Sequence, residues 1–244
     1  MSNTPIAPTA DRASTWNSLY RLGAAAALGT LLVGLVEIGI TFLPGGNTPA
    51  GTVFDWFALL HSNPFMGLRN LGLLNILFCA LDLPIFFALY AAQRKTERSL
   101  AALAMIVSFV GVAVFFATNR AFAMLELSRQ YALAGDAPQK AMLAAAGQAL
   151  LAVGQSHTPG TFLAFCLSEM AGILISLATL RSRLFSPAAA WVGMLGFACL
   201  LVFEVCTSFV PGARPVAMLL AVFGGLLSLV WDLLVARKLI ELAK

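Results

Sequence analysis

The sequence predicts an all-α protein: a polytopic membrane bundle of six transmembrane helices with two short interfacial helices on the outer side. Hydrophobic residues make up 60% of the 244 residues and charged residues only 11%, whereas soluble domains have roughly 45–50% and 25%. The apolar runs are continuous and of helical length, which excludes the short alternating strands of a transmembrane barrel. Helices also satisfy every backbone polar group within the bilayer.

The apolar runs define the elements in order. We expect a disordered cytoplasmic tail over 1–17, a transmembrane domain over 18–236 and a short cytoplasmic tail over 237–244. Basic residues precede the first run as in a signal peptide, but its core is too long and lacks a small-residue cleavage site, so we interpret it as a retained helix. The predicted spans are 18–43, 68–92, 99–127, 160–180, 187–210 and 214–236.

The two long outer connections each contain a short helical pattern. Phe54, Trp56 and Phe57 in the first connection are typical of a helix lying in the headgroup zone. In the second, Asp136 can cap a helix that has a proline in its first turn and runs to about Gly154. This helix is too short and too polar to span. We expect both helices to lie on the outer face, where they could cover the space between the spans.

The positions of the basic residues predict the orientation. Ten of the 15 Lys and Arg residues fall on the side that holds both termini. The positive-inside rule therefore predicts a protein integral to the cell (inner) membrane with cytoplasmic N- and C-termini. The ten residues are Arg12, Arg21, Arg94, Lys95, Arg98, Arg181, Arg183, Arg237, Lys238 and Lys244.

Five acidic residues interrupt the apolar runs: Glu37, Asp82, Glu169, Glu204 and Asp232. A charged residue at the centre of a spanning helix costs about 2.5–3.5 kcal/mol on insertion scales. Small and polar residues recur beside them at helical spacing, which is typical of faces that contact other helices. The acids are therefore expected to face the interior of the bundle.

Depth along the helices sorts these acids further. Glu37, Glu169 and Glu204 fall in the outer half, whereas Asp82 lies nearer the midplane and Asp232 near the cytoplasmic end, where it can reach water. We predict an outer-half cavity, and two alternatives remain open: its carboxylates pair with the arginines, or they await a ligand. The residues predicted to line it are Glu37, Arg69, Asn75, Asn119, Arg120, Glu169 and Glu204.

The remaining chemistry is limited. His61 and His157 lie in the outer connections and are the candidates for a metal site with the carboxylates, but no fixed spacing such as HExxH supports one. The four cysteines lie in apolar runs, no lysine lies within a span, and glycine-rich phosphate loops are absent. We therefore predict no metal and no cofactor, and the basic residues set topology rather than bind nucleic acid.

Three segments resemble a known family: Asn63–Asn75, its continuation to Leu83–Tyr90, and Ser128–Ala134 with the Ala- and Gln-rich helix that follows. They are similar to uncharacterised bacterial six-helix membrane proteins catalogued only as a domain of unknown function. The resemblance covers roughly 20–236, implies a six-helix integral membrane protein and brings no activity with it. An acidic residue often stands in that family where this chain has Asn70.

Three hypotheses for the function follow. The first is a cavity that binds or transports a small or amphiphilic ligand. The second is a membrane-embedded enzyme that acts on lipid-like substrates through a His and carboxylate site, so whether the chain is an enzyme stays open. The third is a structural or accessory subunit. The expected partners are the lipid bilayer and a small-molecule or lipid ligand, with a second copy of the chain or a membrane partner subunit as further alternatives, and no nucleic acid.

Overall fold

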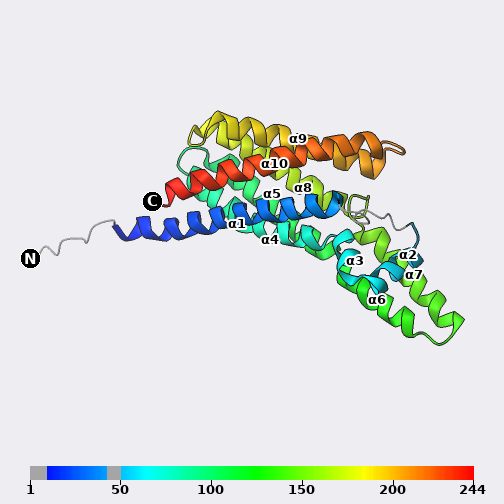
Figure 1. Cartoon of the computed structure of the whole chain (residues 1–244). Coiled ribbons are helices and arrows are strands. Elements are labelled where there is room, and N and C mark those ends of the chain that lie inside the picture. Colours follow the sequence, from blue (N-terminus) through cyan, green and yellow to red (C-terminus); the bar gives the residue numbers. More distant parts are fainter. Residues whose placement is uncertain (1–9, 43–50) are drawn as a thin grey trace, which may run out of the picture.

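The computed structural model describes residues 10–42 and 51–244, and within them it contains ten α-helices and no strand (Figure 1). The prediction of an all-α fold is confirmed. The helices are α1 (Ala10–Phe42), α2 (Val53–Ser62), α3 (Pro64–Asn70), α4 (Leu73–Gln93), α5 (Arg98–Thr118), α6 (Ala121–Leu133), α7 (Ala137–Gly154), α8 (Phe162–Ser182), α9 (Pro187–Phe209) and α10 (Arg214–Leu242).

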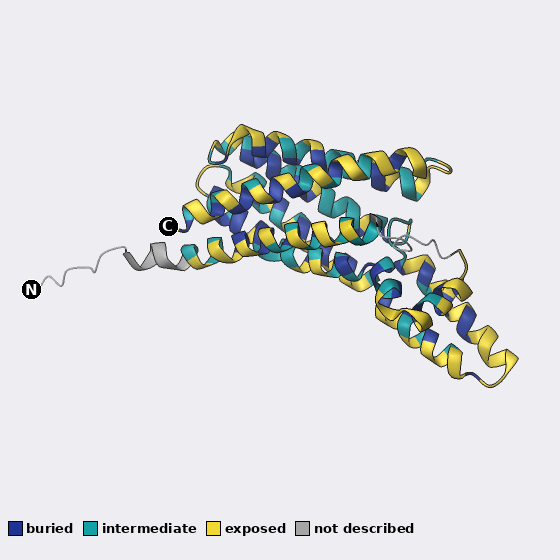
Figure 2. Ribbon diagram, viewed as in Figure 1, coloured by how far each residue is buried: buried dark blue, intermediate teal, exposed yellow. Residues whose placement is uncertain are grey.

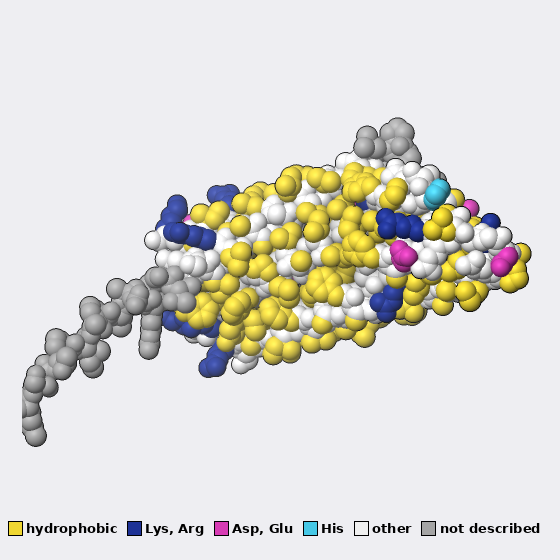
Figure 3. Space-filling model, turned by 90° about the horizontal axis from the view of Figure 1, so that it is seen from below, with side chains coloured by type: hydrophobic (Ala, Val, Ile, Leu, Met, Phe, Trp, Pro, Cys, Tyr) yellow, Lys and Arg dark blue, Asp and Glu magenta, His cyan; other side chains and the backbone are white. Residues whose placement is uncertain are grey.

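Six stretches in the described part of the chain are long and apolar enough to cross a membrane, as predicted. Large hydrophobic side chains cover the outside of the bundle between charged ends, and basic side chains gather at the end that carries the termini (Figure 3). Such an outer surface suits lipid contact. The stretches are Trp16–Thr41, Leu73–Gln93, Arg98–Leu133, Phe162–Ser182, Pro187–Phe209 and Arg214–Leu242.

The long helices form a closed ring in chain order. Each of α1, α4, α5, α8, α9 and α10 packs on the next, and α10 packs back on α1. The start of α1 and the end of α10 lie at the same end of this ring (Figure 1). Buried residues face inward and exposed residues outward along the ring helices (Figure 2).

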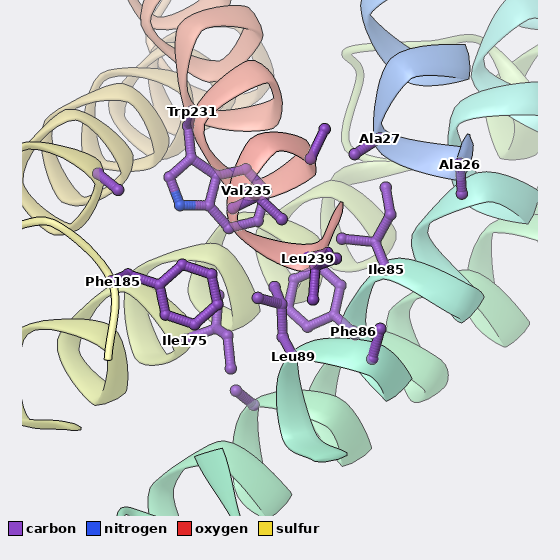
Figure 4. Packing of buried hydrophobic residues seen from close by; sticks show 14 of the residues in the cluster. Ala26, Ala27, Ile85, Phe86, Leu89, Ile175, Phe185, Trp231, Val235 and Leu239 are labelled. Carbon is purple, nitrogen blue, oxygen red and sulfur yellow. The ribbon is translucent and has the colours of Figure 1, made fainter. Parts of the chain in front are cut away.

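A hydrophobic cluster fills the ring near the termini (Figure 4). Trp231, Val235 and Leu239 on α10 meet Phe86 and Leu89 on α4 there. Many of the other members are alanines, and such small side chains allow helices in a membrane to approach closely. The core therefore closes one end of the ring.

The helices α2, α3, α6 and α7 pack on one another and project beyond the other end of the ring (Figure 1). Thr52 and Asp55 form a capping box at the start of α2, and the hydrogen bonds from Thr52 hold the pKa of Asp55 below its usual value. Trp56 and Phe57 are buried among these helices. Of the three aromatic side chains expected in the headgroup zone, Phe54 is exposed, whereas Trp56 and Phe57 pack within this projection.

Several predicted bounds differ from the structure. The predicted cap at Asp136 and the end of its helix at Gly154 are confirmed in α7. The third span was expected to run unbroken to residue 127, but it breaks at Asn119 and Arg120, between α5 and α6. Residues 10–17 belong to α1 and α10 continues to Leu242, so helix replaces part of each predicted tail. Residues 1–9 lie outside the described residues.

Candidate ligand-binding cavity

A cavity of about 300 Å³ lies inside the ring. Residues of α1, α4, α8, α9 and α10 line it, together with His157 from the connection between α7 and α8. Six aromatic residues form much of the wall, and Phe86 and Trp231 at its floor also belong to the core cluster. The aromatic residues are Phe78, Phe86, Phe165, Phe197, Phe203 and Trp231.

Each of the five lining helices contributes one carboxyl group to this cavity. Three of the sequence-predicted carboxylates are therefore brought together, and Asn75 lines the cavity with them. The two acids that were set apart by depth line it as well. The carboxyl groups are those of Glu37, Asp82, Glu169, Glu204 and Asp232.

Glu37 has a cationic partner, Arg69, on the side of α3. The Arg69 guanidinium donates through Nη2 to Glu37 Oε1 at 2.5 Å and through Nε to Oε2 at 3.1 Å. Arg69 also donates to the hydroxyl of Thr41 and, at 3.0 Å, to the side chain of Asn70. This two-point pairing of a guanidinium with a carboxylate fixes both side chains and ties α3 to α1.

Glu204 contacts His157, the basic residue that lines the cavity. The Nδ1 atom of His157 lies against Glu204 Oε1, with the His157 ring stacked on Phe165 and edge-on to Phe203. His157 adopts a left-handed backbone conformation with φ 58°. Glu204 is only 2% exposed, and its Oε2 atom has no hydrogen-bond partner among the described residues.

The remaining carboxyl groups make no hydrogen bond or ion pair with the described residues. Glu169 has a buried Oε2 atom without a partner and lies within electrostatic reach of Glu204 and Asp82. Asp232 interacts electrostatically with Asp82 and is 5% exposed. The expectation that Asp232 reaches water is therefore wrong, because α10 turns this side chain into the ring.

Asn119 and Arg120 serve the backbone instead of the cavity. Asn119 donates to the carbonyl of Leu71 at 3.1 Å and accepts from the amide of Ala121 at 3.1 Å, so it bridges the two helix breaks. Arg120 donates to its neighbour's carbonyl at 3.2 Å, and its aliphatic stem packs against Gly154. Neither residue lines the cavity, and no ion pair of Arg120 occurs within the described chain.

The two histidines lie in different surroundings. His61 is exposed on α2 and does not line the cavity that holds His157. Within residues 10–42 and 51–244, no three His, Cys, Asp or Glu side chains are grouped in a way that could hold a metal ion. The structure therefore does not bring His61 to the carboxylates.

Sequence reasoning missed Asp82, Asp232 and the aromatic wall as parts of the site. A signal for Asp82 was present, because it follows Asn75 and Cys79 at helical spacing. The phenylalanines that line the cavity carried no such signal, since the sequence does not distinguish them from phenylalanines that face lipid.

Comparison with known protein families gives a match. A protein-family model described as Domain of unknown function (DUF4386) matches residues 50–235, which include α2 to α9 and most of α10 but not α1. Neither the curated proteins nor the solved structures give a match to this chain. The resemblance noted from the sequence is confirmed, and the chain belongs to the DUF4386 family of membrane proteins of unknown function.

Proposed function

We propose that this integral membrane protein binds, and in a cellular context transports, a small amphiphilic ligand in the cavity of the ring. The supporting observation is the combination of six aromatic side chains and five carboxyl groups around one space of about 300 Å³. Pockets for small ligands are mostly apolar with a few convergent polar groups, and they begin at about this volume. The predicted ligand residues Glu37, Asn75, Glu169 and Glu204 would contact the ligand directly.

Buried polar pairs that only hold the helices together explain less of the arrangement than ligand binding does. Helices in membranes are often held by buried polar pairs, and Glu37 with Arg69 is such a pair. The carboxyl groups of Asp82, Glu169 and Asp232 have no partner in the described chain. Ionisable residues without a structural partner inside a membrane are expected at functional sites.

The proposed orientation puts the open end of the ring on the outer side of the inner membrane, with both termini in the cytoplasm. It is supported by the basic side chains at the end that carries the termini (Figure 3). In this orientation His157 and the pair of Glu37 and Arg69 would meet a ligand first. The outer projection would flank the entrance.

A cavity-filling variant tests the binding function. The protein in lipid nanodiscs is titrated with hexylamine, hexanol and hexanoate while thermal unfolding is followed. Gly225 lines the cavity and a Cβ there meets open space, so Gly225→Leu should fill the cavity without a clash. Gly39→Leu on the exposed face of α1 is the matched control.

At least one of the three probes should raise the melting temperature of the unmodified protein and of Gly39→Leu, and none should stabilise Gly225→Leu. Shifts that persist in Gly225→Leu would place binding outside the cavity. A complete absence of shifts would refute ligand binding and leave the role of a structural or accessory subunit.

The contact of His157 with Glu204 favours an enzyme as the second candidate. A carboxylate at Nδ1 orients the imidazole and leaves Nε2 as a general base toward the cavity. In this case the protein would activate water against an ester of a lipid-like substrate. Hydrolysis of nitrophenyl hexanoate by the nanodisc protein, lost in His157→Ala and kept in His61→Ala, would support it. Equal background rates in all three proteins would exclude it.

A further inference from the structure

We infer that the ligand of the cavity is a cation, an ammonium group carried on a small apolar body; this inference rests on the proposed function. The first argument is the charge of the wall. Five carboxyl groups line the cavity, and His157 is the only basic residue among the described lining residues. Arg69 compensates Glu37 from the side of α3. An anionic ligand would meet carboxylates without a counter-charge.

The second argument is the set of buried acceptors that lack donors. Asp232 is 5% exposed, lines the cavity and makes no hydrogen bond or ion pair with any described residue. Buried Oε2 atoms of Glu169 and Glu204 also lack partners there. Buried polar atoms in proteins are nearly always hydrogen-bonded. Trp231 Nε1 and the Thr30 hydroxyl also line the cavity without a partner, but the carboxyl oxygens outnumber these groups. An ammonium group presents three N–H donors and no acceptor, which matches a site in which acceptors are in the majority.

The third argument is the aromatic wall. Phe165 and Phe203 flank the imidazole of His157, and Phe197 packs edge-on to Trp231 deeper in the cavity. Aromatic faces attract cations and also accept an apolar chain. A bare metal ion would gain little from such a wall, and no metal-binding cluster occurs among the described residues. The chemistry therefore favours an organic amine over an inorganic cation.

Three probes with a six-carbon chain separate the contribution of charge to binding from the contribution of shape. Binding of hexylamine, hexanol and hexanoate to the nanodisc protein is measured by calorimetry at neutral pH, where the amine is protonated. Hydrogen bonds to a charged group contribute about 1.5–3 kcal/mol. Hexylamine should therefore bind at least about tenfold more tightly than hexanol, and hexanoate more weakly than both.

Variants then test the acceptors. Asp232→Asn should lower the ratio of amine to alcohol affinity by about tenfold. Asp82→Asn, which changes the neighbouring acid, gives the same test if Asp232→Asn does not fold. Glu126→Gln on the exposed face of α6 is the control and should leave the ratio unchanged.

The possible failures are distinct. If hexanol binds as tightly as hexylamine and Gly225→Leu abolishes both, the binding function stands and the cationic ligand is refuted. If hexylamine is selected but Asp232→Asn and Asp82→Asn keep the full selectivity, these acids are not its acceptors and the inference fails. If no probe binds, the proposed function itself fails.

Discussion

Glu37 and Asp232 carry the same chemical group in different surroundings. Glu37 receives two hydrogen bonds from Arg69, whereas Asp232 receives none from the described chain although it is more deeply buried. Removing a carboxylate from water costs several kcal/mol unless hydrogen bonds and an opposite charge replace the lost hydration. At Glu37 the protein supplies that replacement itself. At Asp232 no described residue supplies it, and the side chain lines the cavity instead.

The pair of Glu37 and Arg69 should respond unequally to removal of either partner. The Arg69 side chain is 4% exposed and that of Glu37 is 36% exposed. Glu37→Leu leaves a guanidinium in a buried site without its carboxylate, and breaking a buried pair costs about 3–5 kcal/mol. Arg69→Leu should cost less, because Glu37 still reaches solvent.

Unfolding of both variants by denaturant in nanodiscs measures the difference in the free energy of unfolding. Lys238→Ala removes an exposed pair with Glu241 at 3.1 Å and serves as the control, with an expected loss below about 1 kcal/mol. A larger loss for Arg69→Leu than for Glu37→Leu would contradict this account of the pair.

The site could be predicted from the sequence only where helical spacing carried the information. Glu169 and Glu204 were assigned to the cavity because each lies on a face of small and polar residues. Arg120 was assigned wrongly, because the apolar pattern continues past it and hides the break at Asn119. The contact of His157 depends on a left-handed backbone in a connection, which hydrophobic periodicity does not report.

Glycines set how closely the ring helices approach one another. A Cβ at Gly172 on α8 would lie 2.3 Å from the ring of Phe197 on α9. A Cβ at Gly193 on α9 would lie 2.5 Å from Trp231 on α10. Close helix contacts at small residues are a main source of stability in membranes. The close approach that these glycines allow therefore fixes the positions of Phe197 and Trp231 in the aromatic wall.

Gly172→Ala should therefore destabilise the ring. The added methyl group forces Phe197 or the backbone of α9 to move, and overpacking of this kind costs about 1–3 kcal/mol. Gly39→Ala on α1 is the matched control, since a Cβ there meets nothing within 4 Å. It should be neutral, or stabilising by up to about 1 kcal/mol, because alanine is the better helix former. Thermal unfolding measures the difference in melting temperature between the two variants, and equal melting temperatures would contradict the packing argument.

At the scale of elements, caps were easier to predict than breaks. The bounds of α7 followed from Asp136 and the proline after it. The starts of α4 and α6 did not follow, because α3 and α4 are separated by a left-handed Gly72 within an otherwise helical stretch. The packing of α2, α3, α6 and α7 into a projection depends on contacts between distant segments, which a local pattern does not contain.

The whole molecule has an asymmetry along its axis. A hydrophobic cluster closes the ring near the end of α10, while the cavity with its acids lies toward the end from which α2 and α7 project. The ring closes because α10 packs back on α1. The proposed function therefore implies that a ligand enters from the end of the ring from which α2 and α7 project. The side of the membrane from which the ligand enters therefore depends on the side on which the termini lie.

Labelling of single cysteines should establish that direction. In a variant whose four native cysteines are replaced by serine, Gly135→Cys places a thiol at the exposed turn between α6 and α7, and Lys244→Cys places one at the C-terminus. The basic residues of the inner connections favour cytoplasmic termini. A membrane-impermeant maleimide should therefore label Gly135→Cys in intact cells and Lys244→Cys only after lysis. The reverse pattern would turn the cavity toward the cytoplasm, and equal labelling of both would show two orientations in the same membrane.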